Sequence, residues 1–255
     1  MTAPGAFDEA LKSEPPLLVH GGKQDFLEPA VKGTTEVLEG IQRVAANSVK
    51  RVIFTSSFAA VGAFGREDET RRVYTEQDWN PVELDQIAED DKRLAYLASK
   101  KFAEQAAWDF QKKGVNWDLV SLNPPMVYGP LVHRVSNSAD FNENMYALTR
   151  TQGLARAHLL AMDVAEAGDN RFIICAGTVT SQQIADIFRL NVLGAEVKTP
   201  KGMPGAKTLD ADAYTADTAK AEKVEKVWGL KWTDMRDTFK DLGKQLLEIE
   251  AAEGQ

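Results

Sequence analysis

Tyr96 and Lys100 stand four residues apart at the start of the run YLASKKFAEQAAWDF. If this run is helical, both side chains leave the same face one turn apart, and the ammonium group lies near the phenol. A nearby positive charge lowers the pKa of a phenol and makes a tyrosine a usable proton donor. The pair is therefore a candidate general acid with its cation, although the same spacing also suits a core helix that packs its tyrosine against a sheet.

Three hydroxyl residues, Thr55, Ser56 and Ser57, close the apolar run RVIFTSS. In an open α/β sheet, ligands bind beyond the carboxyl ends of the strands, which is where these hydroxyls would stand. A hydroxyl there can hold a substrate carbonyl oxygen while a tyrosine transfers a proton to it. It is equally possible that Ser56 and Ser57 only cap a turn.

The segment NPPMVYGP, residues 123–130, closes a later apolar run. Its two consecutive prolines fix the backbone and remove donors, and Gly129 permits close approach. The segment therefore suits a rigid ledge that presents backbone groups to a flat ring, or simply a turn.

The elements that must position these residues alternate along the chain. Short apolar runs rich in β-branched and aromatic residues predict buried strands, and they occupy residues 17–20, 51–57, 117–125 and 171–177. Between them lie runs with helical periodicity, including residues 28–47 and the run from Tyr96 to Gly114. Thr180 and Gln183 have capping-box spacing before another helix. This alternation predicts a parallel sheet covered by helices, a Rossmann-like α/β fold.

The composition excludes several function classes. The net charge of -8 argues against a general nucleic-acid binder, which needs clustered Lys and Arg. The three histidines have no metal-ligand spacing, and the single cysteine, Cys175, is expected in a buried strand. No apolar run approaches the length of a bilayer span, and the first residues do not resemble a signal peptide, so a cytoplasmic location is expected.

Taken together, these segments resemble the extended short-chain dehydrogenase/reductase family of epimerase/dehydratase-like proteins, and within it the fungal NADPH-dependent ketone and aldehyde reductases related to dihydroflavonol reductases. The resemblance is carried by EPAVKGTTEVL, SVKRVIFTSSFAAVG, YTEQDWNP, AYLASKKFAEQAAWDF, LNPPMVYGP, LARAHLLAM and RFIICAG. It implies a partial Rossmann-like NAD(P)-binding region over residues 1–130. Residues 131–255 would form a mixed substrate-side and C-terminal helical region, with one strand returning to the sheet.

The resemblance also implies roles for individual residues. Tyr96 would be the general acid, Lys100 would tune that acid and hydrogen-bond the nicotinamide ribose, and Ser57 would orient the carbonyl oxygen. Cofactor contacts are implied for Thr55, Ser56, Tyr96, Lys100, Pro124 and Val127. The implied reaction is hydride transfer from NADPH to a small ketone or aldehyde, with NAD left open as the cofactor.

The chain departs from the family pattern at its start. The family begins with a strand, a G-x-x-G-x-x-G turn and a helix that together bind the pyrophosphate, and no such turn occurs in this sequence. We therefore expect a fold that lacks the first strands. The run at residues 17–20 would then present an open edge that favours self-association.

Three functions remain compatible with the sequence. The first is the NAD(P)H-dependent carbonyl reductase with a Ser/Tyr/Lys triad. The second is a catalytically silent truncated member or binding protein, and the third is a nucleotide-sugar epimerase or dehydratase, which shares the triad. The helix from Tyr96 and the segment DWNP favour the reductase.

Overall fold

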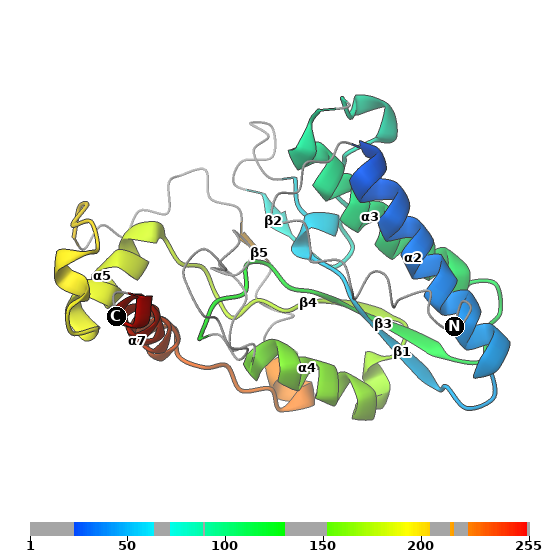
Figure 1. Cartoon of the computed structure of the whole chain (residues 1–255). Helices are drawn as coiled ribbons and strands as arrows, with labels where there is room; N and C mark the ends of the chain where they lie inside the picture. Colours follow the sequence, from blue (N-terminus) through cyan, green and yellow to red (C-terminus); the bar gives the residue numbers. More distant parts are fainter. Residues whose placement is uncertain are drawn as a thin grey trace. The chain divides into compact units, whose positions relative to one another are not determined.

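The computed structural model describes residues 23–63, 72–88, 90–130, 152–204, 215–216 and 224–253. Its elements, in chain order, are α2 (Lys23–Val44), β1 (Arg51–Thr55), η1 (Phe58–Ala60), β2 (Val73–Tyr74), η3 (Leu84–Gln86), α3 (Lys92–Gln111), β3 (Asp118–Asn123), α4 (Gln152–Asp163), η5 (Ala165–Ala167), β4 (Asn170–Ile173), α5 (Ser181–Asn191), η6 (Ala195–Val197), β5 (Thr215–Ala216) and α7 (Met235–Glu253) (Figure 1). The chain divides into two compact units, the first containing β1, β3 and β4 and the second containing α5 and α7.

The first unit is built on a parallel sheet with the strand order β1-β3-β4. Arg51 pairs with Asp118 at the start of β1 and β3, and Thr55 pairs with Leu122 near their ends. The expected parallel sheet with flanking helices is therefore confirmed. The apolar run at residues 17–20, which carries the expected open edge, lies outside the described residues.

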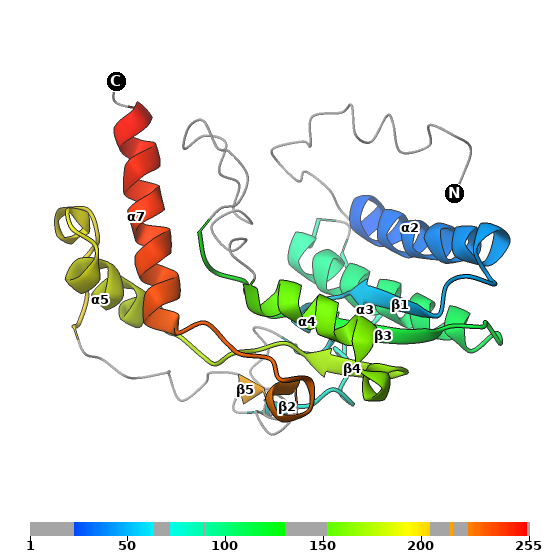
Figure 2. The same cartoon turned by 90° about the horizontal axis from the view of Figure 1, so that it is seen from below.

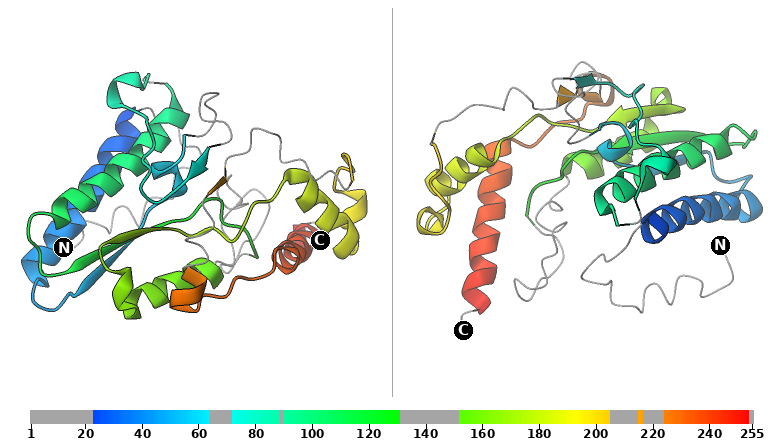
Figure 3. Two further views of the ribbon diagram at one scale, coloured as in Figure 1. Left: turned by 180° about the vertical axis from the view of Figure 1, so that it is seen from behind. Right: turned by 90° about the horizontal axis from the view of Figure 1, so that it is seen from above.

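Alternate residues of β1 face opposite layers of the first unit, as the strand period requires. Val52 and Phe54 pack with a core cluster that includes Leu38 of α2 and Phe110 of α3. On the other face, Arg51 donates hydrogen bonds to the carbonyl oxygens of Ala161 and Val164, so it reaches the end of α4. Figures 2 and 3 show α2 and α3 side by side on one face of the sheet and the second half of α4 along the other.

Helix α3 has a clear start and end in the sequence. Asp91 is its N-cap, because the Asp91 carboxylate accepts a hydrogen bond from the backbone N–H of Leu94 at 2.9 Å. The interior is rich in Ala, Leu and Lys, which are strong helix formers. The helix ends at Gln111, and Gly114 follows with a left-handed φ of 88°.

The second unit packs α5 against α7. Phe188 of α5 meets Phe239 of α7 edge-on at a ring distance of 6.4 Å. The predicted capping box is confirmed at the start of α5, where Thr180 and Gln183 each bind the other's backbone N–H. In the part of the chain that the structure describes, no helix is both long and apolar enough to cross a bilayer.

The strand β4 ends earlier than the sequence predicts. The run RFIICAG forms β4 only as far as Ile173, so Cys175 lies beyond the strand and is half-buried. The Cys175 thiol donates to the carbonyl oxygen of Gly177 at 3.4 Å, and burial raises its pKa. Gly177, beyond the end of β4, adopts a φ of 152°, a backbone conformation that favours glycine.

Candidate active site

Tyr96 and Lys100 lie one turn apart on α3, as their spacing predicts. The Lys100 ammonium nitrogen is 5.5 Å from the centre of the Tyr96 ring. Phe26 of α2 meets the same ring edge-on, with ring centres 6.4 Å apart. Tyr96 is 41% exposed, so its ring is held on one side by protein and remains open to a ligand on the other.

Lys100 differs from Tyr96 in its surroundings. It is half-buried on α3, and the loss of hydration lowers its pKa below the ordinary value of 10.5. A cation with part of its hydration shell removed interacts more strongly with a nearby phenol or ligand hydroxyl than a cation in water does. Lys100 is therefore a partly desolvated cation beside the Tyr96 ring.

Ser57 follows β1 and caps the short helix η1. Its backbone is extended, with φ of -154° and ψ of 151°, and its hydroxyl oxygen accepts a hydrogen bond from the N–H of Ala59 at 3.1 Å. A serine hydroxyl that accepts one bond still carries its own proton as a donor. Ser57 therefore caps the turn and also keeps a hydrogen-bond donor for a carbonyl oxygen.

The two preceding hydroxyls have protein partners. Ser56 is buried, and its hydroxyl donates to the carboxylate of Glu104 at 2.5 Å. Thr55 is exposed on the opposite face of the strand, and its hydroxyl lies 2.7 Å from Nε2 of His158 on α4. Successive side chains along a strand point to opposite faces, so Thr55 and Ser56 lie on different sides of the sheet. Their cofactor contacts stay predictions.

Pro124 is the first residue of the segment 123–130 that lies beyond β3. Its carbonyl oxygen accepts a hydrogen bond from the N–H of Phe58 at 2.9 Å, so this residue is joined to the segment that carries Ser57. Val127 belongs to the second unit, and its contact with a cofactor also stays a prediction.

Glu104 and Asn123 were missed as candidates on sequence grounds. The Glu104 side chain is fully buried on α3, and the Asn123 amide donates to it at 2.6 Å. Glutamate is rarely buried unless it is paired. A glutamate flanked by apolar residues on a helix is therefore a sequence signal for a paired, buried carboxylate. Its spacing was a second signal, because Tyr96, Lys100 and Glu104 follow each other at intervals of four residues along α3.

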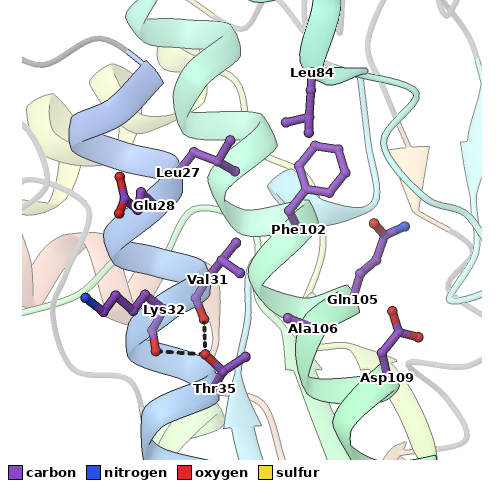
Figure 4. A pocket seen from close by; sticks show the side chains of 10 residues that line it. All are labelled: Leu27, Glu28, Val31, Lys32, Thr35, Leu84, Phe102, Gln105, Ala106 and Asp109. Carbon is purple, nitrogen blue, oxygen red and sulfur yellow. Dashed lines mark hydrogen bonds between the residues drawn. The ribbon is translucent and has the colours of Figure 1, made fainter.

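A groove of about 870 Å³ lies elsewhere on the first unit, between the outer faces of α2 and α3 (Figure 4). Leu27, Val31 and Phe102 supply much of its apolar wall. Ser57, Tyr96 and Lys100 are not among its lining residues, so the groove is separate from the candidate site. Within the described ranges, no cluster of three or more His, Cys, Asp or Glu side chains could hold a metal ion.

Known proteins that resemble this chain in sequence identify its family. Residues 20–172 match the NAD dependent epimerase/dehydratase family. An uncharacterized oxidoreductase of Schizosaccharomyces pombe is 31% identical over 277 residues, which cover 97% of this chain and 80% of the relative. The NADPH-dependent methylglyoxal reductase GRE2 of Saccharomyces cerevisiae is 30% identical over 251 residues, covering 89% of this chain and 72% of the relative.

Solved structures give the same result. The crystal structure of yeast methylglyoxal/isovaleraldehyde reductase Gre2 complexed with NADPH superposes with a TM-score of 0.80 at 28% identity. The match covers 94% of this chain and 76% of the yeast reductase chain. Gre2 from Candida albicans gives a TM-score of 0.79 at 27% identity, covering 96% of this chain and 81% of that chain. The predicted resemblance to reductases is confirmed, and the chain belongs to the NAD dependent epimerase/dehydratase family.

Proposed function

We propose that this protein reduces a small ketone or aldehyde with NADPH as the reductant. The observation that carries the proposal is the position of the Lys100 ammonium, 5.5 Å from the ring centre of the partly exposed Tyr96. The same first unit places Ser57 at the carboxyl end of β1, the end of a parallel sheet where ligands bind. Relatives named as NADPH-dependent reductases support the choice of cofactor.

Each residue of the proposed triad has one task. Ser57 donates a hydrogen bond from its hydroxyl to the carbonyl oxygen of the substrate, keeps its proton, and so fixes the position of that oxygen. Tyr96 supplies a proton to the same oxygen as negative charge develops on it. Lys100 stabilises the phenolate that remains, because its half-buried ammonium is weakly hydrated.

Two residues of the first unit would contact the nicotinamide half of the cofactor. Lys100 would bind the ribose hydroxyls, and Pro124 would lie against the ring. When bound, NADPH supplies the hydride that reduces the carbonyl carbon. The sequence has no G-x-x-G-x-x-G turn for the pyrophosphate, so the affinity for NADPH is the first quantity to measure.

The test combines binding and turnover. NADPH fluorescence is titrated with the purified chain, and NADPH consumption is then followed with methylglyoxal and with a panel of aldehydes and keto esters. Saturable binding and consumption support the reductase. Absence of binding at millimolar NADPH rejects it and favours a silent member of the family. Binding without consumption of any carbonyl also rejects it and directs the search to nucleotide sugars.

A further inference from the structure

Glu104 receives hydrogen bonds from side chains of three different strands or strand ends. Its carboxylate accepts from the hydroxyl of Ser56 at 2.5 Å, from the amide of Asn123 at 2.6 Å and from Nε of Arg171 at 2.6 Å. These donors follow β1, end β3 and belong to β4, respectively. One fully buried carboxylate on α3 therefore joins the helix to all three strands of the sheet.

Hydrogen bonds around the Glu104 carboxylate hold the backbone on both sides of Ser57. Ser56, the preceding residue, is bonded directly to Glu104. The Asn123 amide that donates to Glu104 also donates to the backbone carbonyl oxygen of Ser57 at 3.1 Å. The orientation of this amide is set by Ser121, whose hydroxyl donates to the other end of it at 3.2 Å. Glu104 thus fixes the peptide that carries Ser57 without touching the Ser57 hydroxyl.

We propose that Glu104 is a positioning residue that holds Ser57 in place for the carbonyl oxygen. The proposal rests on the proposed function in so far as Ser57 acts on a substrate. Tyr96, Lys100 and Glu104 lie along one ridge of α3. The helix that carries the acid therefore also fixes the second donor, and the two donors to the carbonyl oxygen share one rigid support.

A carboxylate suits this position because each of its partners donates a hydrogen bond to it in the structure. Arg171 and the indole N–H of Trp108, which lies 3.3 Å away, face one carboxylate oxygen, and the Asn123 amide faces the other. A glutamine amide would place its NH2 group either against Arg171 and Trp108, which cannot accept a hydrogen bond, or against Asn123. In the second case the Asn123 amide would have to turn over and would lose its bond to the Ser57 carbonyl oxygen. Glu104→Gln preserves the shape of the side chain and removes its function.

The first experiment measures hydrogen exchange and needs no cofactor. The N–H groups of Phe58 and Ala59 report on the segment that carries Ser57. The Phe58 N–H donates to the Pro124 carbonyl oxygen, and the Ala59 N–H donates to the Ser57 hydroxyl. We expect Glu104→Gln to lower the protection of both amides by about tenfold or more. Unchanged protection would overturn the proposal. If Glu104→Gln does not fold, Ser56→Ala takes its place, since it removes a single hydrogen bond to Glu104. Lower protection of the Phe58 and Ala59 amides in Ser56→Ala would then support the proposal, and unchanged protection would overturn it.

Arg51→Met is the matched control. Arg51 forms a partly buried ion pair with Asp118 at the amino ends of β1 and β3, whereas Ser57 follows their carboxyl end. The control destabilises the same two strands without touching the Glu104 group. We expect Phe58 and Ala59 to lose less protection in Arg51→Met than in Glu104→Gln when the two variants are compared at equal global stability. Equal losses would overturn the proposal.

The second experiment is a double-mutant cycle on turnover. With Ser57 present, Glu104→Gln is expected to lower kcat by about tenfold or more, while the Kd for NADPH changes by less than about threefold. In a Ser57→Ala background the same change should lower kcat by less than about twofold, because the group it positions is gone. Equal reductions in both backgrounds would show a merely structural role. If the wild-type chain does not turn over at all, the proposed function fails, and the exchange measurement still decides the positioning role.

Discussion

The ammonium of Lys100 lies 5.5 Å from the ring centre of Tyr96, one turn earlier on α3, in surroundings that lower the lysine pKa. The lowered pKa has a consequence for stability. Between that pKa and 10.5, the unfolded chain binds more protons than the folded chain, so the stability contributed by this group rises with pH. Below the lowered pKa, the folded protein bears the full cost of desolvating a charged lysine.

Lys100→Met should therefore be at least as stable as the wild type near pH 7. Its advantage should shrink as the pH approaches about 10, because the wild-type lysine loses its charge and its desolvation cost. Urea unfolding of both proteins across this range gives the two curves. Turnover should fall by about 100-fold or more, since the phenolate loses its cation. A Met variant that is less stable near pH 7 would mean that the charge of Lys100 is well compensated in the fold.

Arg51 is expected to be a main stabilising residue of the first unit. Two of its nitrogens bind the two carboxylate oxygens of Asp118 at 2.7 and 2.8 Å, and it also donates to backbone oxygens at the end of α4. Hydrogen bonding to Asp118 raises the pKa of Arg51, so the guanidinium stays charged. Arg51→Ala should lower the free energy of unfolding by about 2–3 kcal/mol, because Asp118 loses its partner.

Arg51→Lys should recover only part of this lost stability, since a lysine cannot form the bidentate contact with Asp118. The exposed pair of Lys112 and Asp109 provides the control. Lys112→Ala should change stability by less than about 0.5 kcal/mol. Chemical denaturation of all three variants measures these values, and an Arg51→Ala loss no larger than that of Lys112→Ala would refute the assignment.

Asn80, within the segment DWNP, ties the loop before α3 to η1. It is buried, and its amide donates to the carbonyl oxygens of Ala59 and Gly62 while its own oxygen accepts from the N–H of Val82. Asn80→Ala should cost about 2–3 kcal/mol of stability, because two buried carbonyl groups lose their donor.

Asn80→Asp tests the direction of these bonds. The new carboxylate would face two carbonyl oxygens, so the loss should equal or exceed that of Asn80→Ala. The exposed Asn170, which donates to Gly168, is the comparison, and Asn170→Ala should cost less than about 1 kcal/mol. Thermal unfolding of the three variants is sufficient, and an aspartate variant as stable as the wild type would contradict the hydrogen-bond pattern.

Much of the fold follows from local patterns in the sequence. The strands from Arg51 and Asp118 and the capping box at Thr180 appear where β-branched runs and cap residues predict them. Helical periodicity was less exact for α2. Leu38 is buried, but Val37 and Val44 are exposed, because neighbouring residues of a helix point in different directions and only one stripe of α2 packs against the core of the first unit.

The candidate site was only partly readable for a physical reason. Tyr96 and Lys100 are neighbours on one helix, so their spacing alone predicts their proximity. The burial of Glu104 depends on Arg171, which lies 67 residues later, and no local pattern encodes such a pairing. The different surroundings of Ser56 and Ser57 likewise arise only after the strand is placed against α3.

The role of Tyr96 as proton donor is tested by the rate of NADPH consumption with methylglyoxal, measured for the wild type and for Tyr96→Phe. The phenol oxygen is the only group removed, and the Phe26 contact needs only the ring, so the variant should fold normally and bind NADPH within about threefold of the wild type. We expect turnover by the wild type and a loss of about 100-fold or more in the variant. Turnover that Tyr96→Phe retains would contradict the assignment of Tyr96 as the proton donor.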